Sequence, residues 1–183
     1  FATGGIGGVH DTPFDESADL IALANHRVLT VCAGPKSILN ADATAERLET
    51  LGVPLVGYRS QHLAGFVVPL TEVPLPSRVD TPAEAAAVLM AQEALGLPAG
   101  VLLSNPVSAG LSEEEFAGWL AVARSNAASA GVRGRATTPY LLATLAELSG
   151  GGTMTVNLRL LEENARLAAR VAVAYAATAN ATD

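Results

Sequence analysis

Short apolar runs alternate along the chain with longer segments in which apolar residues recur at helical spacing. Three runs are almost entirely apolar and lie at residues 28–33, 55–58 and 101–104. Runs of this kind are typical of strands that are buried on both faces of a parallel sheet. Strand, helix and strand in this order form a parallel pair with a right-handed crossover. The pattern therefore predicts the fold class α/β, as a three-layer α/β/α domain with a mixed, mainly parallel sheet.

Helix start signals flank these runs. Thr81, Pro82 and Glu84 form a capping box with proline at the first helical position, and Ser112 with Glu115 repeats the box. The signals predict helices over residues 18–26, 82–95, 113–130 and 154–178, a short one that ends at residue 148, and one that begins at residue 36 or 41 and ends at residue 51. Between residues 59 and 80 the pattern weakens around three prolines. There we expect an extended arm or a partly covering loop.

The length of 183 residues corresponds to about one domain. Hydrophobic residues make up 50% of the chain and charged residues only 16%, where about 25% is usual, so we expect another chain or segment to cover part of the surface. The first residues, Phe1-Ala2-Thr3, have the pattern of a strand end that runs into a loop. We therefore expect residues 1–183 to form a single α/β domain that is incomplete at its N-terminus.

Charge and cysteine content exclude several classes of function. The net charge is −7 and no basic run occurs, which argues against binding to nucleic acid or to an anionic membrane surface. No apolar stretch reaches the 18 or so residues of a membrane span. The one cysteine, Cys32, lies in an apolar run and is expected to be a buried structural thiol. A reducing, cytoplasmic setting fits these features.

Lys36 is the only lysine in the chain, beside ten arginines. It follows the run 28–33 after Gly34-Pro35, at the carboxyl end of a predicted strand, where ligands of open α/β sheets gather. A lysine amine can lose its proton when it is desolvated and attack a carbonyl carbon, whereas an arginine cannot. Lys36 is therefore either a reactive amine or a surface cation that starts the next helix.

The segment from Thr3 to His10 contains four glycines within five residues. Glycines allow positive φ and can expose backbone N–H groups to an anion. The segment lacks the Gly-Lys-Ser/Thr of a phosphate-binding loop and is not a convincing dinucleotide fingerprint. It is either an anion cradle or a flexible surface loop.

Acidic and amide side chains supply further candidates. The four carboxylates between residues 11 and 19 are too widely spaced to face one ion together. One of them, with water and a substrate phosphate, would suit Mg²⁺ or Mn²⁺. Alternatively, the stretch opens a helix that Ser17 caps and Asp19 stabilises through the helix dipole. Asn157 and Asn164 are seven residues apart and share a helix face, as ligand contacts or as satisfied core groups.

Several ordered motifs together resemble one family. They are Phe-Ala-Thr-Gly-Gly-Ile-Gly-Gly-Val-His, Asp-Glu-Ser-Ala-Asp-Leu from residue 15, Cys-Ala-Gly-Pro-Lys-Ser-Ile-Leu from residue 32 and Thr-Pro-Tyr-Leu-Leu-Ala from residue 138. The chain resembles the pseudouridine-5′-phosphate glycosidases, also known as indigoidine synthase A-like proteins, along nearly all of its length. The resemblance implies a homo-oligomeric enzyme that reversibly cleaves the C–C glycosidic bond of pseudouridine 5′-phosphate. Its products are uracil and ribose 5-phosphate, and its cofactor is a divalent metal, Mn²⁺ in the first place and Mg²⁺ as the alternative.

The resemblance also implies roles for individual residues. Lys36 matches the lysine that forms an imine adduct with C1′ of the ring-opened ribose, and Asp15 matches the metal ligand. The positions that match substrate-binding residues are Thr3, His10, Ser17, Ala18, Asp19 and Asn157.

Two departures from the family pattern bear on activity. Family members have a basic residue after the histidine, where this chain has Asp11, and the stretch from His10 to Asp15 is a few residues shorter here. The family also has an upstream segment, with a glutamate general acid and a second lysine, before the Thr-Gly-Gly loop. The chain is thus expected to be part of a larger enzyme. The alternative is a truncated, non-catalytic homologue that retains only a ribose-phosphate pocket or the oligomer interface.

Overall fold

The fold is built on a four-stranded parallel sheet with the strand order β1-β6-β2-β5. The computed structural model describes residues 1–12 and 14–180. The strands are β1 (Leu29–Cys32), β6 (Val101–Ser104), β2 (Leu55–Tyr58) and β5 (Ser77–Val79), and each neighbouring pair is parallel. The three predicted strands are confirmed. β5 was not predicted, because it lies in the proline-containing stretch that we expected to be an arm.

Helices cover both faces of this sheet. Residues of β1 and β6 point alternately to opposite faces, as strand geometry requires. Val31 and Leu103 pack with Leu167 in the cluster beneath α3 (Pro82–Ala94) and α6 (Gly152–Ala179). Cys32 and Leu102 pack in the opposite cluster, beneath α1 (Ala18–Asn25) and α2 (Ala41–Thr50). The predicted three-layer α/β/α arrangement is confirmed.

A β-hairpin replaces the arm that we expected between residues 59 and 80. Its strands are β3 (His62–Gly65) and β4 (Val68–Pro74), which pair antiparallel in a separate two-stranded sheet. Leu63, Val68 and Val73 are buried and provide the apolar contacts that hold the hairpin to the domain. The prediction failed because prolines are tolerated in a two-stranded sheet, where each strand has a free edge.

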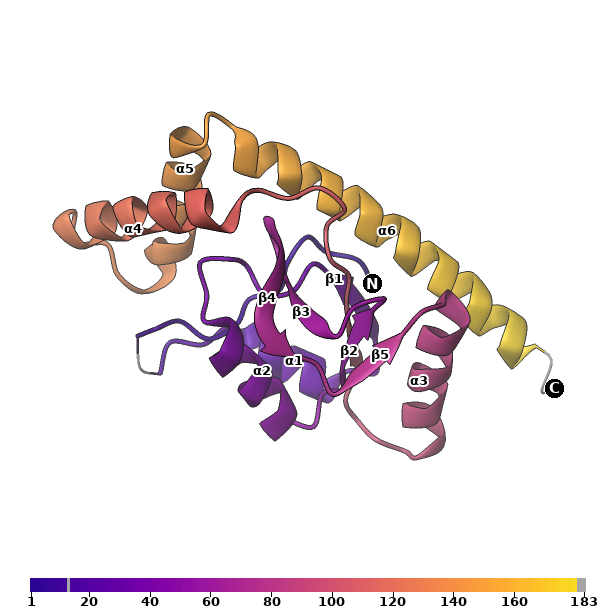
Figure 1. Cartoon of the computed structure of the whole chain (residues 1–183). Helices are drawn as coiled ribbons and strands as arrows, with labels where there is room; N and C mark the ends of the chain where they lie inside the picture. The colour runs from indigo at the N-terminus through magenta and orange to yellow at the C-terminus, as the bar shows by residue number, and fades with distance from the viewer. Residues whose placement is uncertain (13, 181–183) are drawn as a thin grey trace.

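The remaining helices form a third packing unit. These are α4 (Glu113–Ser129), the 3₁₀ turn η1 (Gly134–Ala136) and α5 (Thr137–Leu148). They pack in one cluster with the first turns of α6, and α6 then continues along the sheet to α3 (Figure 1). With 28 residues α6 is about 42 Å long, so one helix connects this unit with the sheet. Within the described part of the chain, no helix is long and apolar enough to cross a membrane.

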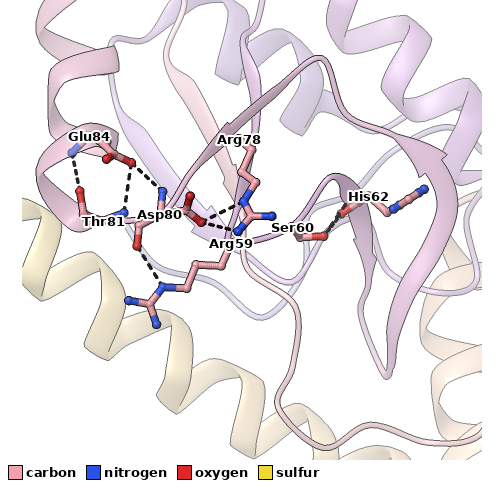
Figure 2. Close-up of polar contacts among 7 residues, drawn as sticks. All are labelled: Arg59, Ser60, His62, Arg78, Asp80, Thr81 and Glu84. Carbon is pink, nitrogen blue, oxygen red and sulfur yellow. Dashed lines mark hydrogen bonds and ion pairs between the residues drawn. The ribbon is translucent and has the colours of Figure 1, made fainter.

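The carboxyl end of β5 leads directly into the predicted capping box of α3. The N–H of Glu84 donates to the Thr81 hydroxyl at 3.2 Å, and the Glu84 carboxylate accepts from the Thr81 N–H at 3.3 Å. Figure 2 shows these contacts beside Asp80, whose carboxylate accepts from Arg78 and whose carbonyl accepts from Arg59. The box confirms the predicted start of α3, directly after the edge strand β5.

The first residues of the chain extend the sheet beyond β1. Ala2 and Val31 form a parallel bridge. The N–H of Val31 donates to the carbonyl of Phe1 at 2.9 Å, and the N–H of Thr3 donates to the carbonyl of Val31 at 3.1 Å. The predicted strand end at Phe1 to Thr3 therefore lies along the outer edge of β1, and it delivers the glycine-rich segment to the carboxyl end of that strand.

Candidate active site

The residues that follow β1 form a turn, which we call the lysine turn (residues 33–37). Gly34 has φ 82°, and a Cβ placed on it would lie 1.9 Å from the carbonyl oxygen of Ala64, so only glycine fits there. Lys36 is half-buried, and its N–H donates to the carbonyl of Ile6 at 3.0 Å. Helix α2 begins at Ala41 with Asn40 as its cap. Lys36 therefore does not start this helix but sits in the turn at the strand end.

The glycine loop (residues 3–10) runs beside the lysine turn. Besides the Lys36 contact, the N–H of Ala33 donates to the carbonyl of Gly4 at 2.8 Å, and the N–H of Ile6 donates to the carbonyl of Gly34 at 3.1 Å. The loop is thus hydrogen-bonded along its length, and the interpretation as a flexible surface loop is wrong.

The glycines of this loop serve close approach rather than unusual backbone angles, because none of the four has a positive φ. A Cβ on Gly7 would lie 2.2 Å from the Ser17 hydroxyl oxygen, and one on Gly8 would lie 2.4 Å from the Thr44 hydroxyl oxygen. Several N–H groups that an anion could have used already have protein acceptors. Among them, the N–H of Val9 donates to the Thr44 hydroxyl at 3.0 Å.

The start of α1 is anchored to the same loop. Ser17 caps the helix and accepts from the N–H of Asp19 at 3.2 Å. The Asp19 carboxylate accepts from the N–H of Gly7 at 2.7 Å. Ala18 is the exposed first residue of the helix. The structural role that we considered for Ser17 and Asp19 is thus present, and it places both side chains against the glycine loop.

His10 and Asp15 lie at the far end of the loop. The N–H of His10 donates to the carbonyl of Asp15 at 2.8 Å, and the His10 Nε2 lies 3.4 Å from the Thr138 hydroxyl. Both residues line a cavity of about 480 Å³. Asp11 and Arg124 line it too and form an ion pair at 2.8 Å. Through this ion pair the guanidinium of Arg124, in α4, lies beside the residue that follows His10.

The donor set around Asp15 fits only a weakly held metal ion. Over residues 1–12 and 14–180, no group of three or more histidine, cysteine, aspartate or glutamate residues is arranged to hold one. Asp11 is already paired with Arg124, so among the residues that line this cavity Asp15 is the carboxylate without that pairing. Mg²⁺ and Mn²⁺ accept such a site when water and substrate oxygens complete the coordination.

The two asparagines of α6 differ in their surroundings. Asn164 is fully buried; its amide donates to the carbonyl of Thr3 at 2.8 Å, and its oxygen accepts from the Asn105 amide at 2.9 Å. It is a satisfied core group that fastens α6 to the glycine loop. Asn157 is exposed and lines a cavity of about 120 Å³. Its oxygen would lie 2.9 Å from a Cβ on Gly4, so Asn157 also borders the loop.

The glycine loop is therefore the common neighbour of the predicted residues. Lys36 bonds to it through Ile6, Asp19 through Gly7, and Asn157 borders Gly4. The structure does not gather all of these side chains in one hollow. Thr3 and Asp19 line one, His10 and Asp15 a second, and Asn157 a third.

Cys32 directly precedes the lysine turn and is fully buried. Burial raises the pKa of its thiol to about 12, against a smaller lowering by hydrogen bonds with the backbone of Gly34 and Ile6. The thiol stays neutral near pH 7, so the predicted structural role is confirmed and the thiol does not compete with Lys36 as a nucleophile.

Sequence reasoning missed two contacts between the lysine turn and the β3–β4 hairpin. The Ser37 hydroxyl donates to the carbonyl of Gly65 at 2.6 Å, and the N–H of Phe66 donates to the carbonyl of Ala33 at 2.7 Å. The two partners of the lysine turn, Gly65 and Phe66, lie where β3 leads into β4. Because the hairpin was not predicted, no signal in the sequence placed Phe66 near Lys36.

Comparison with known proteins identifies the family. Residues 1–174 match the family model described as indigoidine synthase A like protein. The chain belongs to this family. It is 60% identical over 176 residues to the pseudouridine-5′-phosphate glycosidase of Thermus thermophilus and 50% identical over 177 residues to that of Gemmatimonas aurantiaca. These alignments cover 96% and 95% of the chain but 62% and 58% of the relatives, so the chain spans about 60% of their length.

Solved structures agree with this assignment. The prealnumycin C-glycosynthase AlnA, solved in complex with ribulose 5-phosphate, superposes with a TM-score of 0.92 at 37% identity, over 98% of this chain and 61% of that one. An indigoidine synthase A-like protein of Thermotoga maritima gives a TM-score of 0.86 at 35% identity, over 94% of this chain and 57% of that one. The family resemblance of the sequence is thus confirmed.

Proposed function

We propose that the protein to which these residues belong reversibly cleaves the C–C glycosidic bond of pseudouridine 5′-phosphate, with Lys36 as the nucleophile. The observation that carries the proposal is the arrangement of predicted site residues around the glycine loop, with the Lys36 N–H bonded to Ile6. The identity with glycosidases in other organisms supports the substrate class. The AlnA structure adds that a relative holds a pentose phosphate.

In the proposed reaction the C1′–O4′ bond of the sugar breaks, its electron pair stays on O4′, which takes a proton, and the Lys36 amine adds to C1′ and loses a proton. The C–C bond then breaks, and its electron pair leaves with uracil, whose carbon takes a proton from a general acid. The lone pair of the Lys36 nitrogen forms the imine with C1′ at the same time. Water hydrolyses the imine, which releases ribose 5-phosphate and restores the amine.

The other predicted residues would bind and orient the substrate. Thr3 and His10 lie in the glycine loop, and Asn157 and the segment of residues 17–19 border it. Together they present hydroxyl, imidazole, amide and carboxylate groups. Asp15 would hold Mn²⁺, or Mg²⁺ as the alternative, which when bound offsets the charge of the substrate phosphate.

Trapping of the adduct tests the proposal. The protein expressed from its complete reading frame is treated with ribose 5-phosphate and borohydride, and the peptides are analysed by mass spectrometry. We expect a reduced ribose phosphate on the Lys36 peptide and none in Lys36→Arg, which keeps the charge but cannot form the imine. Full glycosidase turnover by Lys36→Arg would remove the nucleophile role. Binding of ribose 5-phosphate without turnover or adduct would instead favour the non-catalytic homologue.

We also propose a homo-oligomer. Three apolar side chains recur along one side of α6: Met154, Leu158 and Leu161, which are 60%, 65% and 41% exposed. Neighbouring exposed apolar side chains of this kind are typical of interaction surfaces. Light scattering at micromolar concentration should give a mass above that of one chain. A monomer mass with a folded circular dichroism spectrum would contradict the proposal.

A further inference from the structure

The turn between β3 and β4, which we call the hairpin turn (residues 65–67), packs on the lysine turn. Its central residue, Phe66, has φ 66°, in the left-handed region that bulky residues rarely adopt. Such a conformation persists only where the surroundings enforce it, and it occurs preferentially at functional sites. The contacts of Phe66 show what enforces it here.

Three hydrogen bonds fix the hairpin turn to the lysine turn. The N–H of Phe66 donates to the carbonyl of Ala33 at 2.7 Å. On either side of Phe66, the Ser37 hydroxyl donates to the carbonyl of Gly65 at 2.6 Å and accepts from the N–H of Val67 at 3.2 Å. The two turns therefore form one hydrogen-bonded unit, and Ser37 is the residue directly after Lys36.

The ring of Phe66 continues this unit to the glycine loop. It is only 6% exposed. A Cβ on Gly5 would lie 2.6 Å from its Cδ2 and 3.1 Å from the carbonyl oxygen of Gly34. The ring thus packs where the glycine loop and the lysine turn come together, one residue before the Ile6 carbonyl that accepts the Lys36 N–H.

We infer that Phe66 is a positioning residue for Lys36, and this inference rests on the proposed function. The ring keeps the glycine loop at its distance from the lysine turn, while Ser37 fixes the other side of the same turn. A leucine at position 66 stays apolar but lacks the ring that packs on Gly5. Because a displacement of about 1 Å can cost up to ~100-fold in rate, we expect Phe66→Leu to slow adduct formation at Lys36 by roughly 10- to 100-fold.

The experiment measures the rate of borohydride trapping of ribose 5-phosphate on the Lys36 peptide, in the protein expressed from its complete reading frame. Phe116→Leu is the matched control. Phe116 is also 6% exposed, belongs to the same apolar cluster and lines the same 120 Å³ cavity, but it comes from α4. We expect both variants to lower the thermal midpoint by similar amounts and only Phe66→Leu to slow trapping.

Ser37 supplies a second test that does not depend on how well Phe66→Leu folds. Ser37→Ala removes the hydroxyl that holds Gly65 and Val67 and should slow trapping, whereas Ser37→Thr keeps a hydroxyl and should restore it. If trapping is slowed equally by Phe66→Leu and Phe116→Leu, or is unchanged by Phe66→Leu and Ser37→Ala, the positioning role is overturned. A parent protein that forms no adduct overturns the proposed function, and this inference with it.

Discussion

The glycine loop and the hairpin turn both pack against the lysine turn, but they do so by opposite means. The loop contains four glycines, and each keeps an ordinary φ; the missing side chains make room for neighbours such as Ser17 and the Phe66 ring. The hairpin turn has a large side chain on a left-handed residue. The comparison teaches that glycine marks close packing in the loop, whereas the hairpin turn has a left-handed backbone at Phe66, a residue that no sequence pattern singles out.

Gly34, in the lysine turn, has both a close neighbour and a left-handed backbone. The largest effect of a substitution on stability is expected there. Gly34→Ala would place a Cβ 1.9 Å from the carbonyl oxygen of Ala64 on a residue with φ 82°. A clash with backbone cannot be relieved by a side-chain rotation, so we expect a loss of roughly 4 kcal/mol in the free energy of unfolding. Urea denaturation followed by circular dichroism measures it.

Gly52→Ala is the matched control for Gly34→Ala. Gly52 has φ 70°, but a Cβ there meets no atom within 4 Å. Its substitution should cost only the conformational strain, about 1 kcal/mol. Equal losses for the two variants would mean that the close contact with Ala64 contributes nothing.

The two asparagines of α6 extend the comparison to the glycine loop. Asn164→Ala would leave the Asn105 amide and the Thr3 carbonyl without their buried partner. We expect a loss of about 2–3 kcal/mol in the free energy of unfolding. Asn157→Ala, at an exposed position of the same helix face, should stay within about 0.5 kcal/mol of the parent. A larger loss for Asn157→Ala in denaturant titration would contradict this assignment.

Much of the fold could be predicted from the sequence because its signals were local. The three apolar strands and the capping box of α3 depend on neighbouring residues only, and both are as predicted. The hairpin was missed because β4 contains Pro69 and Pro74 and the turn has no Asn-Gly or Asp-Gly signal. Its stability comes instead from long-range contacts, such as the Ser104 hydroxyl that accepts from the N–H of Ala64 at 3.0 Å.

In the candidate site, too, only features that depend on residues close in sequence could be predicted. The position of Lys36 at a strand end could be predicted, because strand and turn are adjacent in sequence. The sequence could not decide between Asn157 and Asn164, since a shared helix face does not tell which part of that face is covered. Val67 and Ser37 are hydrogen-bonded across 30 residues of chain, and Phe66 bonds to Ala33 in the same turn; no periodicity carries that information.

Cys32, next to the lysine turn, should make the free energy of unfolding depend on pH, with a smaller change than in the variants above. Its pKa is raised in the folded state, from 9.0 to about 12, so the stability from the neutral thiol is complete below pH 9 and is lost as the pH rises toward 12. At pH 10 the loss should be about 1.4 kcal/mol. Urea titrations of the parent and of Cys32→Ala between pH 8 and 10.5 measure it as the difference in slope. Rapid alkylation of the native thiol near neutral pH would show that the lysine turn opens readily.

The smallest effect is expected at Asp15, at the far end of the glycine loop. One carboxylate replaces few waters of a divalent ion, so Mn²⁺ binding in the absence of substrate should be weak. Asp15→Asn should lower the affinity about tenfold or less in titration calorimetry. Asp11→Asn removes the same charge from the same cavity, but its carboxylate is already paired with Arg124, so it should change Mn²⁺ binding less. If Asp11→Asn has the larger effect, the metal site belongs to Asp11, and the far end of the glycine loop then binds its ligand through a residue that departs from the family pattern.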